Sequence, residues 1–345
     1  MRSRRTGASA AVGAVAAAGL VAAALVFAAV GAVAAGEGDA GRPERVTPKL
    51  FASIHRHEIH AAVDVPAQHL HVVDTFRFHE PVKGRPFRFL LNRELALRSV
   101  ALPDGTRLAW TELPRWDPRH FWARPPYEDL DDFGIVREIE VTPPAEGWGI
   151  RPALRVEYAG VVADSLHEPQ RAYGRSFETT SGRIVSEGAY LAGSTFWVPW
   201  CGESMYPFDL TVDLPAEWRV VSQGEERSDE VTGGRRKTRW ICADPMEEIY
   251  LVAGPYELHE VRHGDLRVLA YAYENTGPEV LEPYLSSTGP VIDRYAEQFG
   301  PYPYKKFALV ENYWQTGYGM PSFTFLGDRV IRLPFIVDTS YPHEI

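Results

Sequence analysis

The sequence predicts a mainly β domain followed by the start of an α+β domain. From about residue 47 to residue 273, short runs of β-branched and aromatic residues are separated by Pro, Gly and Asp. Several runs alternate strictly between apolar and polar residues, which is typical of half-buried antiparallel strands. After Tyr273 the apolar residues recur at helical spacing. We therefore predict a large antiparallel β-sandwich or saddle over 47–273 and an incomplete α+β domain over 274–345.

Residues 1–38 form a separate segment ahead of these domains. Three arginines within the first five residues precede an uncharged run of Ala, Val, Gly and Leu from Thr6 to Gly36. This order is typical of an export signal, and Ala32-Val33-Ala34 offers a small-residue cleavage site. The run is also long enough to span a bilayer, so cleavage and a retained membrane anchor through residues 6–36 both stay open. In either case we expect an exported protein, periplasmic or extracellular.

Length and charge limit the functional classes. The chain has 345 residues, more than one hydrophobic core usually carries, so two folded units are expected after the N-terminal segment. Its formal net charge of −10 argues against nucleic acid or an anionic membrane surface as a partner. The two cysteines are Cys201 and Cys242. In an exported chain they can form a disulfide, and the paired and unpaired states both stay open.

The second region begins with an amphipathic helix. Its apolar face recurs three or four residues apart and consists of Leu281, Tyr284, Leu285, Thr288, Ile292, Tyr295 and Phe299. Gly300-Pro301 ends the run, whereas Pro283 and Pro290 interrupt the helical pattern. Two strands are then predicted, over 306–310 and 323–326.

The chain finishes on the opening letters of a zinc motif. His343-Glu344-Ile345 matches the first three positions of H-E-x-x-H, in which two histidines one helical turn apart hold zinc and the glutamate activates water. Thr339-Ser340 provides an N-cap candidate and Pro342 falls in the first turn, which is how a helix begins. The sequence therefore predicts that His343 and Glu344 lie on a helix.

A complete match to the motif occurs earlier, at His259-Glu260-Val261-Arg262-His263. Gly254-Pro255 breaks the chain before it and Gly264-Asp265 is a turn dipeptide after it, which leaves too few residues for an ordinary helix. The following run is again β-rich, so the segment is predicted to be one strand of a hairpin. Residues four apart on a strand lie roughly 13 Å from one another, too far to share one zinc ion. We therefore do not expect His259 and His263 to bind zinc.

Further motifs occur in a defined order along the chain. Pro245-Met246 precedes Tyr250-Leu251-Val252-Ala253, and Phe299-Gly300-Pro301-Tyr302-Pro303-Tyr304 joins the predicted helix to a strand. Gly317-Tyr318-Gly319-Met320 then precedes a second strand and the terminal His-Glu pair. Their order resembles the M1 family of zinc metallopeptidases, the aminopeptidase N-like gluzincins. The resemblance covers most of the chain after residue 50.

The resemblance implies a thermolysin-like catalytic domain and one Zn²⁺ ion in the full-length protein. His343 would be the first zinc ligand, and Glu344 the general base that takes a proton from the attacking water. The backbone of Tyr318, Gly319 and Met320 would align a peptide or protein substrate as an edge strand. On this hypothesis the chain is the N-terminal portion of an exported metallopeptidase. The fragment itself, which lacks the other zinc ligands, is expected to be inactive.

One departure from the family pattern concerns specificity. The family's aminopeptidases carry G-x-M-E-N, whose glutamate binds the substrate's free α-amino group, whereas here Met320 is followed by Pro321-Ser322. The missing carboxylate leaves exopeptidase specificity open, with Glu311 as a weak substitute. The alternative hypothesis is a non-catalytic protein of the same fold, with a degenerate zinc site, that binds a partner.

Overall fold

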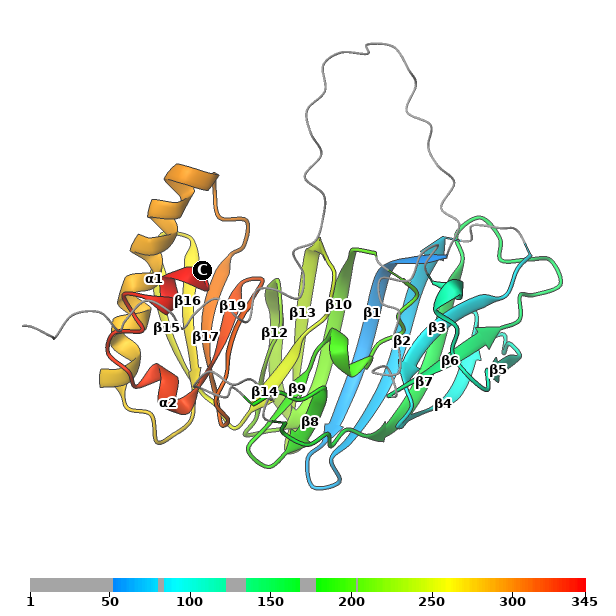
Figure 1. Ribbon diagram of the computed structural model, residues 1–345, viewed down its shortest axis with the longest axis horizontal. Coiled ribbons are helices and arrows are strands. Elements are labelled where there is room, and N and C mark those ends of the chain that lie inside the picture. The colour runs from blue at the N-terminus through cyan, green and yellow to red at the C-terminus, as the bar shows by residue number, and fades with distance from the viewer. Residues whose placement is uncertain (1–51, 80–83, 122–134, 168–177, 203) are drawn as a thin grey trace, which may run out of the picture. The chain divides into compact units, whose positions relative to one another are not determined.

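The computed structural model describes residues 52–79, 84–121, 135–167, 178–202 and 204–345. The predicted export signal or anchor, residues 1–38, lies outside the described residues, so export remains a prediction. Strands dominate the described chain and form four sheets (Figure 1). Among the helices of this part of the chain, none is both long and apolar enough to cross a membrane.

Three of the sheets come from the strands before residue 255. The largest follows the spatial order β12 (Glu225–Thr232), β13 (Arg235–Met246), β10 (Tyr206–Pro215), β1 (Ser53–Asp64), β2 (His69–His79), β7 (Ala153–Val161), β4 (Leu95–Ala101). The second follows β11 (Arg219–Val221), β14 (Leu251–Gly254), β9 (Gly188–Leu191), β8 (Gly182–Val185). The third follows β3 (Phe87–Asn92), β6 (Val136–Val141), β5 (Trp110–Glu112).

These three sheets share one hydrophobic core, as the apolar–polar alternation predicts. In β2, Leu70, Val72, Phe76 and Phe78 are buried while most of their neighbours are partly or fully exposed. Buried side chains of the other two sheets, such as Phe89 and Leu191, belong to the same cluster. The mainly β character predicted for this region is therefore confirmed.

The prediction of purely antiparallel pairing is wrong at the centre of the largest sheet. β1 pairs with β10 in parallel, with His57 opposite Phe208. Only strands joined by a short turn are constrained to run antiparallel, as β1 and β2 do. β10 reaches the free side of β1 after many intervening residues, so the local sequence did not determine its direction.

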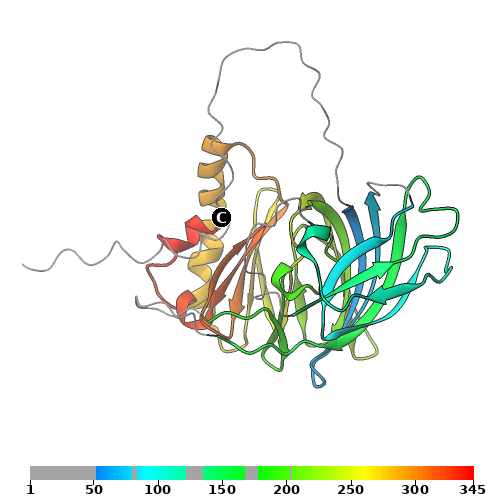
Figure 2. The ribbon, with the colours of Figure 1, turned by 45° about the vertical axis from the view of Figure 1, so that its right-hand side comes forward.

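The fourth sheet contains strands from both sides of residue 273. Its spatial order is β15 (Glu257–His263), β16 (Leu266–Ala272), β17 (Lys306–Asn312), β19 (Phe323–Gly327), β18 (Gly317–Met320). The two faces of this sheet pack differently. Leu269 and Val310 join the core of the β domain, whereas Ala270 and Leu309 pack into a second core with helix α1 (Pro278–Phe299). Figures 1 and 2 both show α1 on the face that points away from the largest sheet.

Helix α1 is continuous despite its two internal prolines. Pro283 and Pro290 both lie inside it, and Gly300 ends it with a φ of 97°. Of the predicted apolar face, Leu281, Tyr284, Thr288 and Ile292 are buried. Phe299 is the last residue of the helix, as the spacing predicts, and is 81% exposed, with its ring 6.0 Å from that of Tyr295.

Cys201 and Cys242 are both buried in the structure. The Cys201 sulfur accepts a hydrogen bond from Ile54 N at 3.1 Å. The Cys242 thiol donates to Asp244 O at 3.4 Å, and burial raises its pKa to about 11. The raised pKa of the Cys242 thiol makes it a poor candidate nucleophile.

Candidate functional site

The predicted helix at the end of the chain begins where the sequence indicates. Helix α3 spans Ser340–His343, with Pro342 in its only turn. Thr339 precedes it, but its hydroxyl donates to Phe335 O at 2.7 Å and does not cap the helix. The predicted helix start is confirmed, whereas side-chain capping is wrong because the preceding turn takes the hydroxyl.

Side chains of α1 hold α3 in place. The buried ring of Tyr341 packs edge-on against Tyr284, with ring centroids 4.8 Å apart, and its hydroxyl bonds to Thr288 Oγ1 at 2.6 Å. Tyr295 donates its hydroxyl hydrogen to the backbone oxygen of Pro342 at 2.9 Å. Tyr284, Thr288 and Tyr295 all belong to the predicted helix. The position of the two residues that follow Pro342 is therefore set by α1.

Glu344 follows directly on α3 and lies against the edge strand β18. Its backbone N–H donates to Tyr341 O at 3.0 Å, which fixes its backbone. The side chain is half-buried, and this burial raises the pKa of the carboxyl, while the neighbouring His343 acts in the opposite direction. A Cβ built on Gly319 would lie 2.5 Å from Glu344 Oε2. The carboxylate thus occupies the space that any other residue at position 319 would need for its side chain.

Strand β18 is the edge of its sheet. It pairs antiparallel with β19, with Tyr318 opposite Phe325 and Met320 opposite Phe323. Along its other side it pairs with no strand of the described residues. Met320 is buried, and the Tyr318 ring stacks on Tyr190 of the β domain at 6.0 Å. β19 therefore holds the backbone of β18 along one side, and the other side is an unpaired sheet edge among the described residues.

The structure brings together the residues that the sequence singled out. Glu344 and Gly319 approach each other, and Tyr318 and Met320 flank Gly319 on the same strand. His343, the last residue of α3, is exposed and directly precedes Glu344 in the sequence. Their catalytic, metal-binding and substrate-binding roles remain predictions, because proximity alone does not demonstrate chemistry.

A zinc ion needs more donors than these residues offer. Zinc in a catalytic site takes three protein ligands, and His343 supplies one imidazole. Within the described ranges, no group of three His, Cys, Asp or Glu side chains is arranged to hold a metal ion. The described residues therefore do not fit zinc by themselves.

Glu311 is committed to the interior of the fold. It is 1% exposed and accepts hydrogen bonds from Tyr273 N at 2.9 Å, from Thr276 Oγ1 at 2.7 Å and from Arg332 Nη1 at 2.9 Å. These bonds tie β17 to the start of α1 and to the segment after α2 (Asp328–Ile331). The structure contradicts a substrate-binding role for Glu311.

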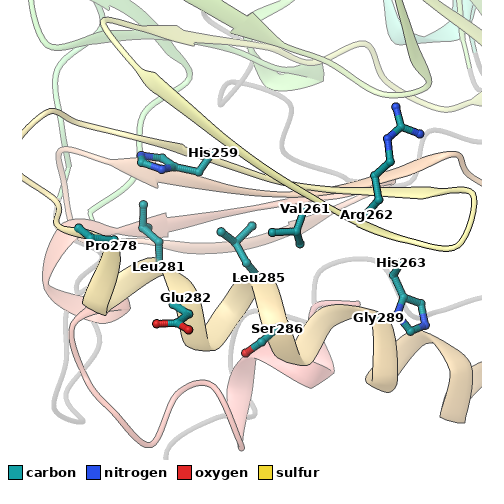
Figure 3. Close-up of a pocket in the computed structure, with 10 residues that line it drawn as sticks. All are labelled: His259, Val261, Arg262, His263, Pro278, Leu281, Glu282, Leu285, Ser286 and Gly289. Carbon is teal, nitrogen blue, oxygen red and sulfur yellow. The ribbon is translucent and has the colours of Figure 1, made fainter.

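The complete His259–His263 motif lies on a strand, as predicted. It forms β15, which pairs antiparallel with β16 through a tight turn at Gly264. Between this hairpin and α1 lies a cavity of about 340 Å³ (Figure 3). The two imidazoles lie at opposite ends of it, and His263 Nε2 is 2.7 Å from Asp293 Oδ2 of the helix. This arrangement does not let the two histidines share a metal ion.

The sequence did not predict the close contact of Gly319 with Glu344. A signal for it was present, because glycine inside a predicted strand often marks close approach of another group. Gly317 and Gly319 alternate in β18, yet a Cβ on Gly317 would meet nothing closer than Leu326 at 3.8 Å. The spacing of the glycines could not tell which one is crowded.

Comparison with known proteins gives a clear result at the level of structure. The sequence matches no protein-family model and no curated protein. The fold matches an M1 zinc metallopeptidase from Deinococcus radiodurans, with a TM-score of 0.57 and 18% identity over 81% of this chain and 61% of that one. A point mutant of the M1 zinc metallopeptidase from the same organism, bound to a Tyr-Ser-Ala substrate, matches with a TM-score of 0.60 and 16% identity over 86% of this chain.

The chain spans 61% and 65% of the length of these two structures. Its mostly β architecture of several sheets agrees with the N-terminal domain of such enzymes, as the resemblance implied. At this level of identity the similarity concerns the fold. The described chain has the fold of the M1 zinc metallopeptidases.

Proposed function

We propose that this chain is the N-terminal portion of an exported M1-like zinc metallopeptidase that hydrolyses peptide bonds. The observation that carries the proposal is the contact between the Glu344 carboxylate and Gly319 of the edge strand β18. In a peptidase, a base must lie within reach of the bond that an edge strand presents. The M1 fold of the chain and the bound peptide of one structural neighbour support this assignment.

Each residue of the site has a defined part in this proposal. The backbone of Tyr318, Gly319 and Met320 pairs with an extended peptide. Glu344 accepts a proton from the attacking water, and the raised pKa of its carboxyl makes it a stronger base for that step. His343 provides one zinc ligand, and the remaining ligands come from chain beyond Ile345. Zinc bound there would supply Lewis acidity toward the scissile carbonyl.

A second candidate function rests on the turn after Met320. Pro321-Ser322 stands where the family's aminopeptidases have the glutamate that binds the α-amino group. Neither residue of this turn has a carboxylate, and Ser322 is 3% exposed with a φ of 71°. A non-catalytic M1-fold protein with a degenerate zinc site, which binds a peptide or protein partner along β18, accounts for this substitution.

The reading frame beyond the codon for Ile345 distinguishes the two proposals. For the peptidase we expect one further residue and then histidine, followed by a glutamate ligand in the next helix. The protein expressed with that extension should cleave peptides, and a chelator should abolish the cleavage. A stop codon, or a residue unable to bind zinc at the histidine position, would contradict the peptidase and favour the binding protein.

A further inference from the structure

Lys306 carries a buried amino group between two sheets. It is the first residue of β17 and is 2% exposed. Its ammonium lies 5.1 Å from the ring centroid of Trp240, in β13 of the largest sheet, and 5.3 Å from that of Phe323 in β19. A buried charge is costly unless its hydrogen-bond donors are used. The partners of this ammonium therefore indicate what Lys306 does.

Those partners belong to a single residue, Ser322. The Lys306 Nζ donates to the Ser322 carbonyl oxygen at 3.1 Å and to its Oγ at 2.8 Å. The same carbonyl oxygen accepts a hydrogen bond from Ala308 N, also at 3.1 Å. Residues of β17 thus hold Ser322 through both its backbone and its side chain.

Ser322 adopts a conformation that needs such support. Its φ of 71° lies in the left-handed region, which residues other than glycine rarely occupy. With Pro321 it forms the two-residue turn that joins β18 to β19, in which Met320 pairs with Phe323. The turn therefore determines where β18 ends and how it lies beside β19.

The same strand carries the contact with Glu344. Gly319 is the neighbour of Met320, and the Glu344 carboxylate fits the space above it closely. A shift of the Ser322 turn would move the β18 backbone relative to that carboxylate. Lys306 lies outside this contact and acts on it through the turn.

We propose that Lys306 is a positioning residue that, through Ser322, holds the β18 backbone in its place against Glu344. The effect of Lys306 on catalysis rests on the proposed peptidase function. Its effect on the position of β18 does not, and can be measured in a protein without activity.

The test compares Lys306→Met with Lys305→Met by amide hydrogen exchange of the complete chain. Lys305 is the exposed neighbour of Lys306 and serves as the matched control. We expect Lys306→Met to accelerate exchange in peptides covering residues 316–327 by roughly tenfold or more, because both hydrogen bonds from Lys306 Nζ to Ser322 are lost. Lys305→Met should leave these peptides unchanged.

A second substitution separates positioning from mere filling of space. Glycine adopts a positive φ without strain, so Ser322→Gly should return the exchange of Lys306→Met to within about threefold of the wild-type rate. Wild-type exchange in Lys306→Met, or a failure of Ser322→Gly to restore slow exchange, would overturn the proposal. If Lys306→Met does not fold, Ser322→Ala takes its place. Ser322→Ala removes the Oγ acceptor and should accelerate exchange only in the peptides covering residues 316–327. Unchanged exchange there, or equally faster exchange throughout the chain, would overturn the proposal.

Activity of the extended protein adds an independent readout. The kcat/KM for a peptide should fall in Lys306→Met, recover when Ser322→Gly is added and remain unchanged in Lys305→Met. A complete lack of peptidase activity in the wild type would refute the proposed function, while the exchange experiment would still decide the role of Lys306. Exchange that follows the prediction together with an unaltered kcat/KM in Lys306→Met would show that β18 does not position the substrate.

Discussion

Glu344 and Gly319 are the pair of residues on which the functional proposal depends. A methyl group on Gly319 would lie 2.5 Å from Glu344 Oε2, well inside contact distance. The atom it meets is the end of a flexible side chain, so the carboxylate would move at little cost in stability. The chemistry would suffer more than the fold, because misplacing a catalytic group by about 1 Å can cost a hundredfold in rate.

Gly319→Ala should therefore lower kcat/KM of the extended protein by roughly tenfold to a hundredfold, with little change in its melting temperature. Gly317→Ala is the control on the same strand, since its Cβ would meet Leu326 at an ordinary 3.8 Å. Steady-state kinetics and thermal unfolding of both variants check this. Equal activity in the two variants would mean that the crowding at Gly319 has no catalytic role.

The β domain contains a buried pair that matters for stability. His57 Nδ1 and Asp74 Oδ2 are 2.7 Å apart across β1 and β2, and both side chains are 0% exposed. Asp74→Ala leaves the imidazole buried without its partner and should destabilise the fold by about 3 kcal/mol. Glu157→Ala breaks the partly exposed pair of His71 and Glu157 and should cost about 1 kcal/mol or less. Urea unfolding of both variants measures the difference; similar losses would contradict it.

At the scale of elements, the sequence predicted the helices and strands whose residue patterns repeat over short distances. Period-two alternation identified β2, and helical spacing identified α1 from Leu281 to Ile292. Both signals depend on neighbours within a few residues, which share one face of an element. The parallel pairing of β1 with β10 had no such local signal, because it joins segments that are distant in sequence.

The site shows the same limit. The sequence placed His343 and Glu344 on a helix and Gly319 on a strand edge; His343 and Gly319 lie as predicted, whereas α3 ends at His343 and Glu344 follows it. That Glu344 lies against Gly319 depends on how α3 packs on α1, which local patterns do not encode. Lys306 gave no signal either, because one lysine in a β-rich run does not distinguish a buried ammonium from a solvated one.

Burial of the Lys306 amine also makes the free energy of unfolding depend on pH. Burial lowers the pKa of Lys306 from 10.5 to about 7. Above pH 7 the folded protein releases this proton while the unfolded chain keeps it, so the free energy of unfolding rises with pH. The effect can be followed to about pH 9. Beyond that, the Cys242 thiol, whose pKa burial raises from 9.0 to about 11, opposes it by ionising in the unfolded chain.

Between pH 7 and pH 9 we expect the free energy of unfolding to increase by up to about 2 kcal/mol through Lys306. In Lys306→Met this increase should be absent, whereas Lys305→Met should retain it. Urea unfolding of the three proteins at several pH values measures the slopes. An equal slope in Lys306→Met would show that Lys306 keeps its proton in the folded state.

For the whole molecule, the fold agrees with M1 zinc metallopeptidases at 16% and 18% identity. Similarity at this level of identity supports a shared fold, whereas activity depends on individual residues. The chain contains Glu344 and His343 in the expected order, and it lacks the carboxylate after Met320. Its activity therefore has to be established from its own residues.

The chain from residue 1 to residue 345 should show no zinc-dependent peptidase activity by itself. One imidazole from His343 is too few ligands for tight binding, so equilibrium dialysis should find no stoichiometric zinc. Peptide turnover by this chain that a chelator abolishes would contradict the proposed site. In that case His259 and His263 would again be candidate zinc ligands.

The most direct test of the central claim is Glu344→Gln in the protein extended beyond Ile345. Glutamine keeps the size of the side chain and cannot accept the proton, so turnover of a peptide should fall by about a hundredfold or more. Metal analysis should still find one zinc per chain, because Glu344 is not a ligand in this account. Turnover close to that of the wild type would remove Glu344 from its role as the general base and contradict the account.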